Sequence, residues 1–327
     1  MMKAKQQGFT LLELLVVITL LAVLSVGALV AYEGIGENAS NVSAANNIKT
    51  ADSAIRAFRA VENRYPNQWD NLANLGGETV GGAYDTLADA TRAFFGQAVA
   101  LDTTNTTVQA ALASMARVGV SEFQTLRTTS VRPVGVPPNE FFNESAPGVA
   151  VPADEIEVEL DANNNFDQVE FAGAAAPAIS LSIVPSGGAA GTCTFATVNL
   201  ANNFLGNTEP TVAGLGASTK LNRINDALDS DVCHLVVAVG FGKDVPGTTL
   251  GSRVAISTAP TYTNGTVINP ANNYARYIAL FHLGSDNEDA PDNTVAADEL
   301  FDRARLLAVV DTEGRNIDTA IAGAFAN

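Results

Sequence analysis

Glu13 is the one charged residue in an apolar run of 23 residues that extends from Phe9 to Ala31. A helix of this length spans the hydrocarbon core of a bilayer. A carboxylate inside such a helix costs about 2.5–3.5 kcal/mol on insertion scales, and residues of this kind are usually functional. Glu13 is therefore predicted to pair with a positive group; the alternative is a charge that is tolerated because it lies near the helix end.

A short polar leader precedes the apolar run and contains the basic residues Lys3 and Lys5. Basic residues on one flank keep that flank in the cytoplasm, so residues 1–8 are predicted to stay inside and the rest of the chain to lie outside. An ordinary secretory signal has a shorter apolar stretch and a small-residue cleavage site after it. The sequence after Ala31 contains no such site.

The segment from Gly8 to Val17 reads GFTLLELLVV. It resembles the processing motif of type IV prepilins, with a glycine, an aromatic residue and a glutamate at fixed offsets at the edge of a membrane helix. The resemblance implies that prepilin peptidase cuts after Gly8 and that the new N-terminal residue, Phe9, is N-methylated. It also implies that Glu13 pairs with the free amine of Phe9 on a neighbouring subunit during assembly.

The resemblance covers the first ~30 residues and also implies a set of partners and locations. The partners are prepilin peptidase, further copies of the chain in a homopolymeric filament, the machinery that assembles a pilus or a secretion pseudopilus, and membrane lipid before assembly. The precursor is expected in a bacterial inner membrane with a single pass. The processed subunit is expected in a periplasmic or extracellular filament.

Beyond the membrane run of residues 9–31, the helical period continues without proline until Pro66. Apolar residues recur at spacings of three and four, which is typical of one buried helix face: Ala44, Ile48, Ala51, Ile55 and Phe58. This pattern predicts an amphipathic continuation over 32–62, packed on a globular head that extends from 63 to 327.

The predicted head has two parts. Alanine-rich stretches at 85–96 and 107–118 predict helices in the part that ends near residue 150. Beyond 150, short apolar runs separated by Gly, Pro and Asn predict strands at 156–160, 169–171, 179–184, 235–241, 277–283 and 306–310. Residues 155–171 read as a hairpin with acidic side chains outward. The expected fold class is α+β, a long helix on an antiparallel sheet, as in pilins.

Cys193 and Cys233 are the only two cysteines, which is the minimum for one disulfide in an oxidising compartment. Pilins often carry one disulfide in the C-terminal half of the head, so the resemblance implies a bridge here. Two buried thiols are the alternative.

Two acidic loops raise the question of calcium. Residues 161–167 alternate oxygen ligands like the first half of a calcium loop, but Phe166 stands where glycine is expected, so a polar hairpin turn is favoured. A second loop lies where major pseudopilins bind calcium. Its candidate ligands are Asp286, Asn287, Glu288, Asp289 and Asp292. A calcium site and a solvated acidic loop both remain open there.

Composition excludes several functions. With 18 basic and 35 acidic residues, the formal charge of −17 repels phosphate backbones, so nucleic acid is not expected as a partner. The sequence contains no phosphate loop, nucleophile elbow or zinc-spaced cluster. Its two histidines, His234 and His282, read as strand residues. No catalytic residue is predicted, and the expected function is a structural filament subunit. The alternative is a minor pilin or type II secretion pseudopilin with a binding role in its enlarged head.

Overall fold

The computed structural model covers the 327-residue chain. It describes residues 10–95, 97–143, 153–171, 174–175, 178–187, 193–200, 218–228, 232–242, 267–286 and 292–325. Two compact units divide the chain: residues 1–45 with 318–327, and residues 46–317.

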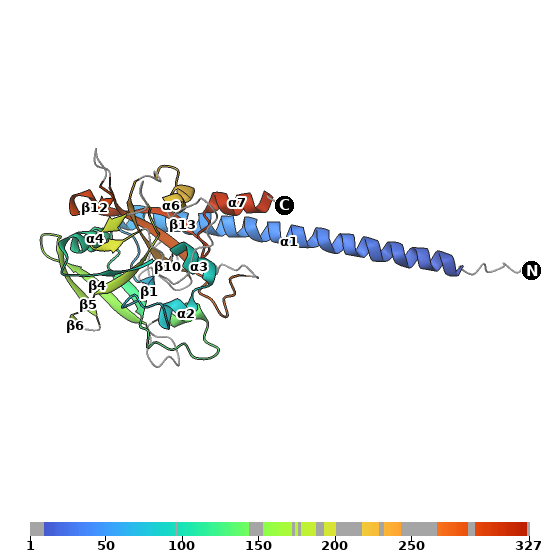
Figure 1. The fold of residues 1–327 in the computed structure, drawn as a ribbon, viewed down its shortest axis with the longest axis horizontal. Coiled ribbons are helices and arrows are strands. Elements are labelled where there is room, and N and C mark those ends of the chain that lie inside the picture. Colours follow the sequence, from blue (N-terminus) through green and yellow to red (C-terminus); the bar gives the residue numbers. More distant parts are fainter. Residues whose placement is uncertain are drawn as a thin grey trace, which may run out of the picture. The chain divides into compact units, whose positions relative to one another are not determined.

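The first unit consists mainly of helix. Helix α1 (Leu11–Glu62) begins in it, and helix α7 (Ile317–Phe325) provides its C-terminal part (Figure 1). The two helices lie close near Asn41, because a Cβ atom built on Gly323 would lie 3.6 Å from Nδ2 of Asn41. The expectation of one long helix that ends near residue 62 is confirmed.

The last part of α1 belongs to the second unit and packs into its core. Ile48, Ala51, Ile55 and Phe58 are all buried, which confirms the apolar stripe predicted from the sequence. Just after the helix, the hydroxyl of Tyr65 accepts a hydrogen bond from the backbone N–H of Leu306 at 3.2 Å. The end of α1 is thereby fixed to the C-terminal part of the sheet.

The main sheet of the head has ten strands within the described residues, in the order β13-β11-β10-β1-β3-β4-β5-β6, with β7 pairing with both β10 and β2. A second small sheet has the order β12-β8-β9. The strand bounds are β1 (Trp69–Asn74), β2 (Gln97–Leu101), β3 (Glu122–Leu126), β4 (Asp154–Leu160), β5 (Phe166–Phe171), β6 (Ala174–Ala175), β7 (Ile179–Ile183), β8 (Thr194–Phe195), β9 (Val198–Asn199), β10 (His234–Phe241), β11 (Tyr277–Ser285), β12 (Thr294–Val295) and β13 (Leu300–Val310).

The sheet is mixed, which corrects the expectation of a purely antiparallel one. Strands β1 and β3 pair in parallel, and so do β12 and β8. Parallel neighbours need a long crossover, and the chain between β1 and β3 carries three helices and β2. The six strands predicted beyond residue 150 are present, and β4 and β5 form the predicted antiparallel hairpin. The α+β fold class, an apolar N-terminal helix followed by a β-sheet head, is confirmed.

The part of the head before residue 150 has helices within both stretches predicted to be helical, and it also has strands that the sequence did not predict. It contains β1, β2 and β3, which all belong to the main sheet. Its helices are short: α2 (Gly82–Thr86), α3 (Asp89–Phe95), α4 (Thr106–Ala116) and α5 (Pro138–Phe141). Later in the head, the described residues include α6 (Ser218–Ile224) and the 3-10 turn η2 (Ala297–Glu299).

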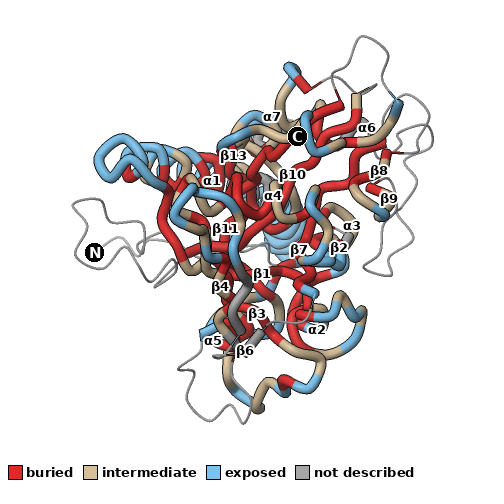
Figure 2. The backbone as a smooth tube through the Cα atoms, turned by 90° about the vertical axis from the view of Figure 1, so that its left-hand side faces the viewer, coloured by how far each residue is buried: buried red, intermediate tan, exposed pale blue. Residues whose placement is uncertain are grey.

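The core of the head lies along the central strands, where β1, β3, β7 and β10 are drawn as buried in Figure 2. Trp69 on β1 makes edge-to-face contacts with Phe241 and Phe281, at ring-centroid distances of 5.3 and 5.5 Å. Its indole N–H donates to the carbonyl of Pro66 at 2.6 Å, so the one polar atom of this large side chain is satisfied.

Candidate functional site: the N-terminal helix

The first turns of α1 expose a continuous apolar surface. From Leu11 to Val30 every residue is exposed, and this stretch is long and apolar enough to cross a membrane. Soluble monomers rarely expose apolar patches larger than a few hundred Å². Within the described residues, the chain leaves this whole surface uncovered.

Glu13 sits at the start of this helix in a capping box with Thr10. One oxygen of the carboxylate, Oε2, accepts the backbone N–H of Thr10 at 2.9 Å and its hydroxyl at 2.8 Å. The backbone N–H of Glu13 donates in return to the hydroxyl of Thr10 at 3.3 Å. This reciprocal pattern satisfies donors that the first turn of a helix otherwise leaves without partners.

A disulfide joins the two cysteines of the head. The sulfur atoms of Cys193 and Cys233 are bonded, with the Cα atoms 5.5 Å apart. Neither cysteine is free. The bridge ties the segment before β8 to the start of β10, the central strand next to β1.

The acidic loop after β11 starts against this disulfide. The backbone N–H of Asp286 donates to the carbonyl of Cys233 at 3.0 Å, and its carboxylate oxygen Oδ2 accepts the N–H of Asn293 at 2.8 Å. The other oxygen, Oδ1, is buried and has no hydrogen-bond partner within the described residues. At the far end of the loop, Asp292 accepts the N–H of Thr294 at 2.8 Å. Asn287, Glu288 and Asp289 lie outside the described residues.

The two histidines face each other across β10 and β11, as predicted for strand residues. The hydroxyl of Ser285 lies 2.8 Å from Nδ1 of His234 and 2.9 Å from Nε2 of His282. Burial, with a smaller contribution from the neighbouring His234, lowers the pKa of His282 to about 4. Both rings are buried.

The other acidic loop, between β4 and β5, is a hairpin turn. Oδ1 of Asp161 accepts the backbone N–H groups of Asn163 and Asn165, both at 2.8 Å. Asn164 adopts the left-handed conformation that turns require, with φ of 67°. The backbone hydrogen bonds lower the pKa of the Asp161 carboxyl, whose oxygen is engaged with its own chain. This supports the polar turn that the sequence favoured.

Residues 3–29 match the family model of the prokaryotic N-terminal methylation motif. The chain carries the prepilin signature of type IV pilins and pseudopilins. Comparison with curated proteins and with solved structures gives no match. Gly8 and Phe9, the expected cleavage and methylation residues, fall inside the matched segment and outside the described residues.

The prepilin signature implies processing by prepilin peptidase and assembly by pilus-like machinery. It suggests a structural subunit, and the exposed helix fits a membrane-anchored precursor. The capping box adds a chemical detail that the sequence analysis missed. The pattern Thr-x-x-Glu just before an apolar run is a helix-start signature, so Thr10 could have been identified from the sequence.

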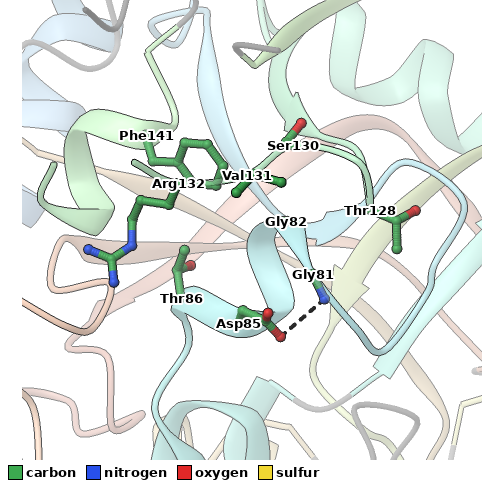
Figure 3. Close-up of a pocket in the computed structure, with 9 residues that line it drawn as sticks. All are labelled: Gly81, Gly82, Asp85, Thr86, Thr128, Ser130, Val131, Arg132 and Phe141. Carbon is green, nitrogen blue, oxygen red and sulfur yellow. Dashed lines mark hydrogen bonds between the residues drawn. The ribbon is translucent and has the colours of Figure 1, made fainter. Parts of the chain in front are cut away.

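Figure 3 shows a cleft of about 270 Å³ in the head, lined by residues from α2, α5 and the segment that follows β3. Two charged side chains border it. Asp85 accepts the backbone N–H of Gly81 at 3.1 Å, and Arg132 donates to the carbonyl of Val136 at 2.7 Å. Both charged groups are thus held by nearby backbone atoms. No sequence pattern had indicated this cleft.

Proposed function

We propose that the chain is a structural subunit of a type IV pilus-like filament. The observation that carries this proposal is the uncovered apolar face of α1 between Leu11 and Val30. Near its start lies one carboxylate, Glu13, which accepts hydrogen bonds from Thr10. Lipid covers that face in the precursor, and the same helices of neighbouring subunits cover it in the filament. Because association through this helix needs only packing and one charge pair, no catalytic residue is required.

Assembly follows from cleavage. Cutting after Gly8 creates a positive amine on Phe9, and burying that amine in an apolar filament core is costly unless a carboxylate lies next to it. Glu13 of the neighbouring subunit supplies the carboxylate. In the free chain Thr10 holds this group by two hydrogen bonds, which keeps it oriented and lowers the cost of having it at the membrane edge.

Replacement of Gly8 tests the processing step. With Gly8→Val, uncut precursor should accumulate in the membrane and no filaments should form. Gly27→Ala is the matched control for cleavage, because a Cβ atom at Gly27 meets nothing within 4 Å of the chain itself and the change leaves the leader intact. Removal of the leader from the Gly8→Val variant, shown by N-terminal sequencing, would contradict the proposed cleavage site.

We also propose calcium binding at the acidic loop that starts with Asp286 and ends with Asp292. The support is the buried oxygen Oδ1 of Asp286, which lacks a hydrogen-bond partner among the described residues. A ligand that binds only the folded state raises the melting temperature. Added calcium should therefore raise the melting temperature of the full-length protein in detergent, and Asp286→Asn should remove most of the shift. An equal shift in both proteins would exclude the loop as the binding site.

The alternative function is that of a minor pilin or type II secretion pseudopilin whose head binds a partner. The charged cleft between Asp85 and Arg132 favours it, because a purely structural subunit does not need one. Mass spectrometry of sheared filaments separates the two functions. A major subunit should dominate the filament mass, whereas a minor subunit should be present in a few copies.

A further inference from the structure

Three carboxylates converge on one face of the main sheet, on β3 and on β4, the strand that leads into the turn at 161–167. Glu122 lies on β3, and Glu155 and Glu157 lie on β4. One oxygen from each lies within 4.8 Å of the other two, and all three side chains are partly buried. The arrangement follows from the antiparallel register, in which Glu122 is paired with Glu157 and residues two apart on a strand share a face.

Like charges at this distance repel, and the three side chains are only partly exposed to water. Burial, together with the neighbouring Glu155 and Glu157, raises the pKa of Glu122 to about 7. One amide donor is present, since Nε2 of Gln68 donates to Oε1 of Glu155 at 2.9 Å. The cluster is therefore a place where a positive charge would be strongly favoured.

A second observation comes from the row of residues that crosses the same sheet face. Gln124 on β3 is paired with Glu155 on one side and with Asp70 of β1 on the other. Gln124 is 5% exposed, and its amide oxygen Oε1 accepts no hydrogen bond within the described residues. A buried carbonyl oxygen without a donor costs about 1–3 kcal/mol, so its position beside the cluster indicates a missing positive or donating group.

On the Asp70 side of this row, one carboxylate oxygen has two donors, whereas the other, Oδ1, is buried without a hydrogen-bond partner within the described residues. Arg276 donates to Oδ2 of Asp70 at 2.7 Å, and the hydroxyl of Tyr274 donates to the same oxygen at 2.6 Å. Arg276 thus supplies a positive charge on the Asp70 side of Gln124, and a cation held by the glutamates would supply one on the other side. A water molecule could donate to Gln124, but it would not reduce the repulsion among the three carboxyl groups.

We propose that Glu122, Glu155 and Glu157 form a divalent-cation site in which the amide oxygen of Gln124 is a further ligand. Calcium fits this set best. Two oxygens on one calcium ion can lie up to about 5 Å apart, twice the Ca–O distance, whereas magnesium requires a tighter octahedron. The ion would join β3 to β4, because its ligands come from both strands.

The test uses the full-length protein in detergent with the Asp286→Asn and Asp292→Asn changes, so that the loop after β11 does not contribute. Calcium binding is measured by titration calorimetry, and melting temperature is measured with calcium chloride or magnesium chloride at equal ionic strength. Glu155→Gln removes a ligand and keeps the side-chain shape. Glu159→Gln is the matched control, since it removes the same charge from an exposed position on the same strand.

One calcium ion per chain should bind in this background and in the Glu159→Gln protein. Glu155→Gln should weaken calcium binding by about tenfold or more, because even loss of a residue that only orients a metal ligand has an effect of that size. Gln124→Leu should weaken calcium binding too. Magnesium should raise the melting temperature less than calcium. The proposal would be overturned if the protein with only the Asp286→Asn and Asp292→Asn changes bound no calcium, or if Glu155→Gln and Glu159→Gln bound it with equal affinity. The three glutamates would then be explained by a proton that they share.

Discussion

The backbone N–H and the hydroxyl of Thr10 both donate to a single carboxylate oxygen of Glu13, at 2.9 and 2.8 Å. The residue expected to pair with a neighbouring subunit is therefore first used to start its own helix. These two roles need different properties of the side chain. Capping needs an acceptor oxygen, whereas pairing with an amine needs a negative charge.

Two substitutions separate these roles. Glu13→Gln keeps an acceptor at the third helical position, where glutamine also completes a capping box, but it removes the charge. Filaments should be lost while cleavage persists. Thr10→Ala removes the hydroxyl and keeps the charge, so it should cost about 1 kcal/mol of helix capping and leave filaments present. Filament yield is measured by electron microscopy of sheared material, and leader removal by N-terminal sequencing. Normal filaments from Glu13→Gln would show that the charge does not drive assembly.

The disulfide predicts a large stability effect. The bridge between Cys193 and Cys233 closes a loop with a sequence separation of 40. On the chain-entropy model such a loop contributes roughly 4 kcal/mol. The double variant Cys193→Ser, Cys233→Ser should lose about this much free energy of unfolding in urea titrations of the detergent-solubilised protein.

The same variant should also loosen the acidic loop, because Asp286 donates its backbone N–H to the carbonyl of Cys233. Hydrogen exchange at the amide of Asp286 should become faster than in the parent protein. The bridged state itself is checked by alkylation: both cysteines should resist labelling in denatured protein that has not been reduced. Labelling of both would contradict the bridge.

The buried His282 predicts a loss of stability in weak acid. Its pKa in the folded protein is about 4, below the value of roughly 6.5 expected in the unfolded chain, because burial and the neighbouring His234 and Arg305 disfavour the charged ring. The unfolded state therefore takes up a proton first as the pH falls. The contribution of His282 is complete above pH 6.5 and is lost progressively down to about pH 4, by roughly 3 kcal/mol.

The measurement is the free energy of unfolding of the full-length protein between pH 7.5 and 4. His282→Gln should flatten the profile, since glutamine keeps a polar group near Ser285 but does not titrate. His234→Gln is the companion variant and should flatten it less, because His282 remains. A slope unchanged by His282→Gln would show that other groups cause the acid sensitivity.

The parts of the fold that the sequence predicted are those with local, periodic signals. The 3.6-residue period identified α1, and short apolar runs bounded by Gly, Pro or Asn identified β10, β11 and β13. Strand β1 escaped prediction because it reads WDNLAN, with polar residues that usually indicate a loop. The buried side chain of Asn71 is satisfied by partners distant in sequence: its Nδ2 donates to the carbonyl of Ser180 at 2.7 Å and to the hydroxyl of Thr125 at 3.2 Å.

The candidate sites also differ in whether the sequence alone could reveal them. Gly8, Phe9 and Glu13 form a contiguous motif, so they could be identified without a structure. The cluster of Glu122, Glu155 and Glu157 could not, because it depends on which strand pairs with β4 and in which register. A sequence shows that these acids alternate along a strand, but not which residues lie opposite them.

Gly240 on β10 provides a test of how tightly the core is built around Asp70. A Cβ atom on Gly240 would lie 1.8 Å from the hydroxyl oxygen of Tyr274, which donates to Asp70 at 2.6 Å. Gly240→Ala must therefore push Tyr274 away and weaken this hydrogen bond. Overpacking of this kind costs about 1–3 kcal/mol, and the weakened buried bond adds to it. Tyr274→Phe removes the clashing oxygen, so the double variant should lose less stability than the sum of the two single changes. The free energies of unfolding of the four proteins are compared in urea. Strictly additive losses would mean that the two residues do not compete for the same space, and the contact would then have to be relieved by movement of β10 instead.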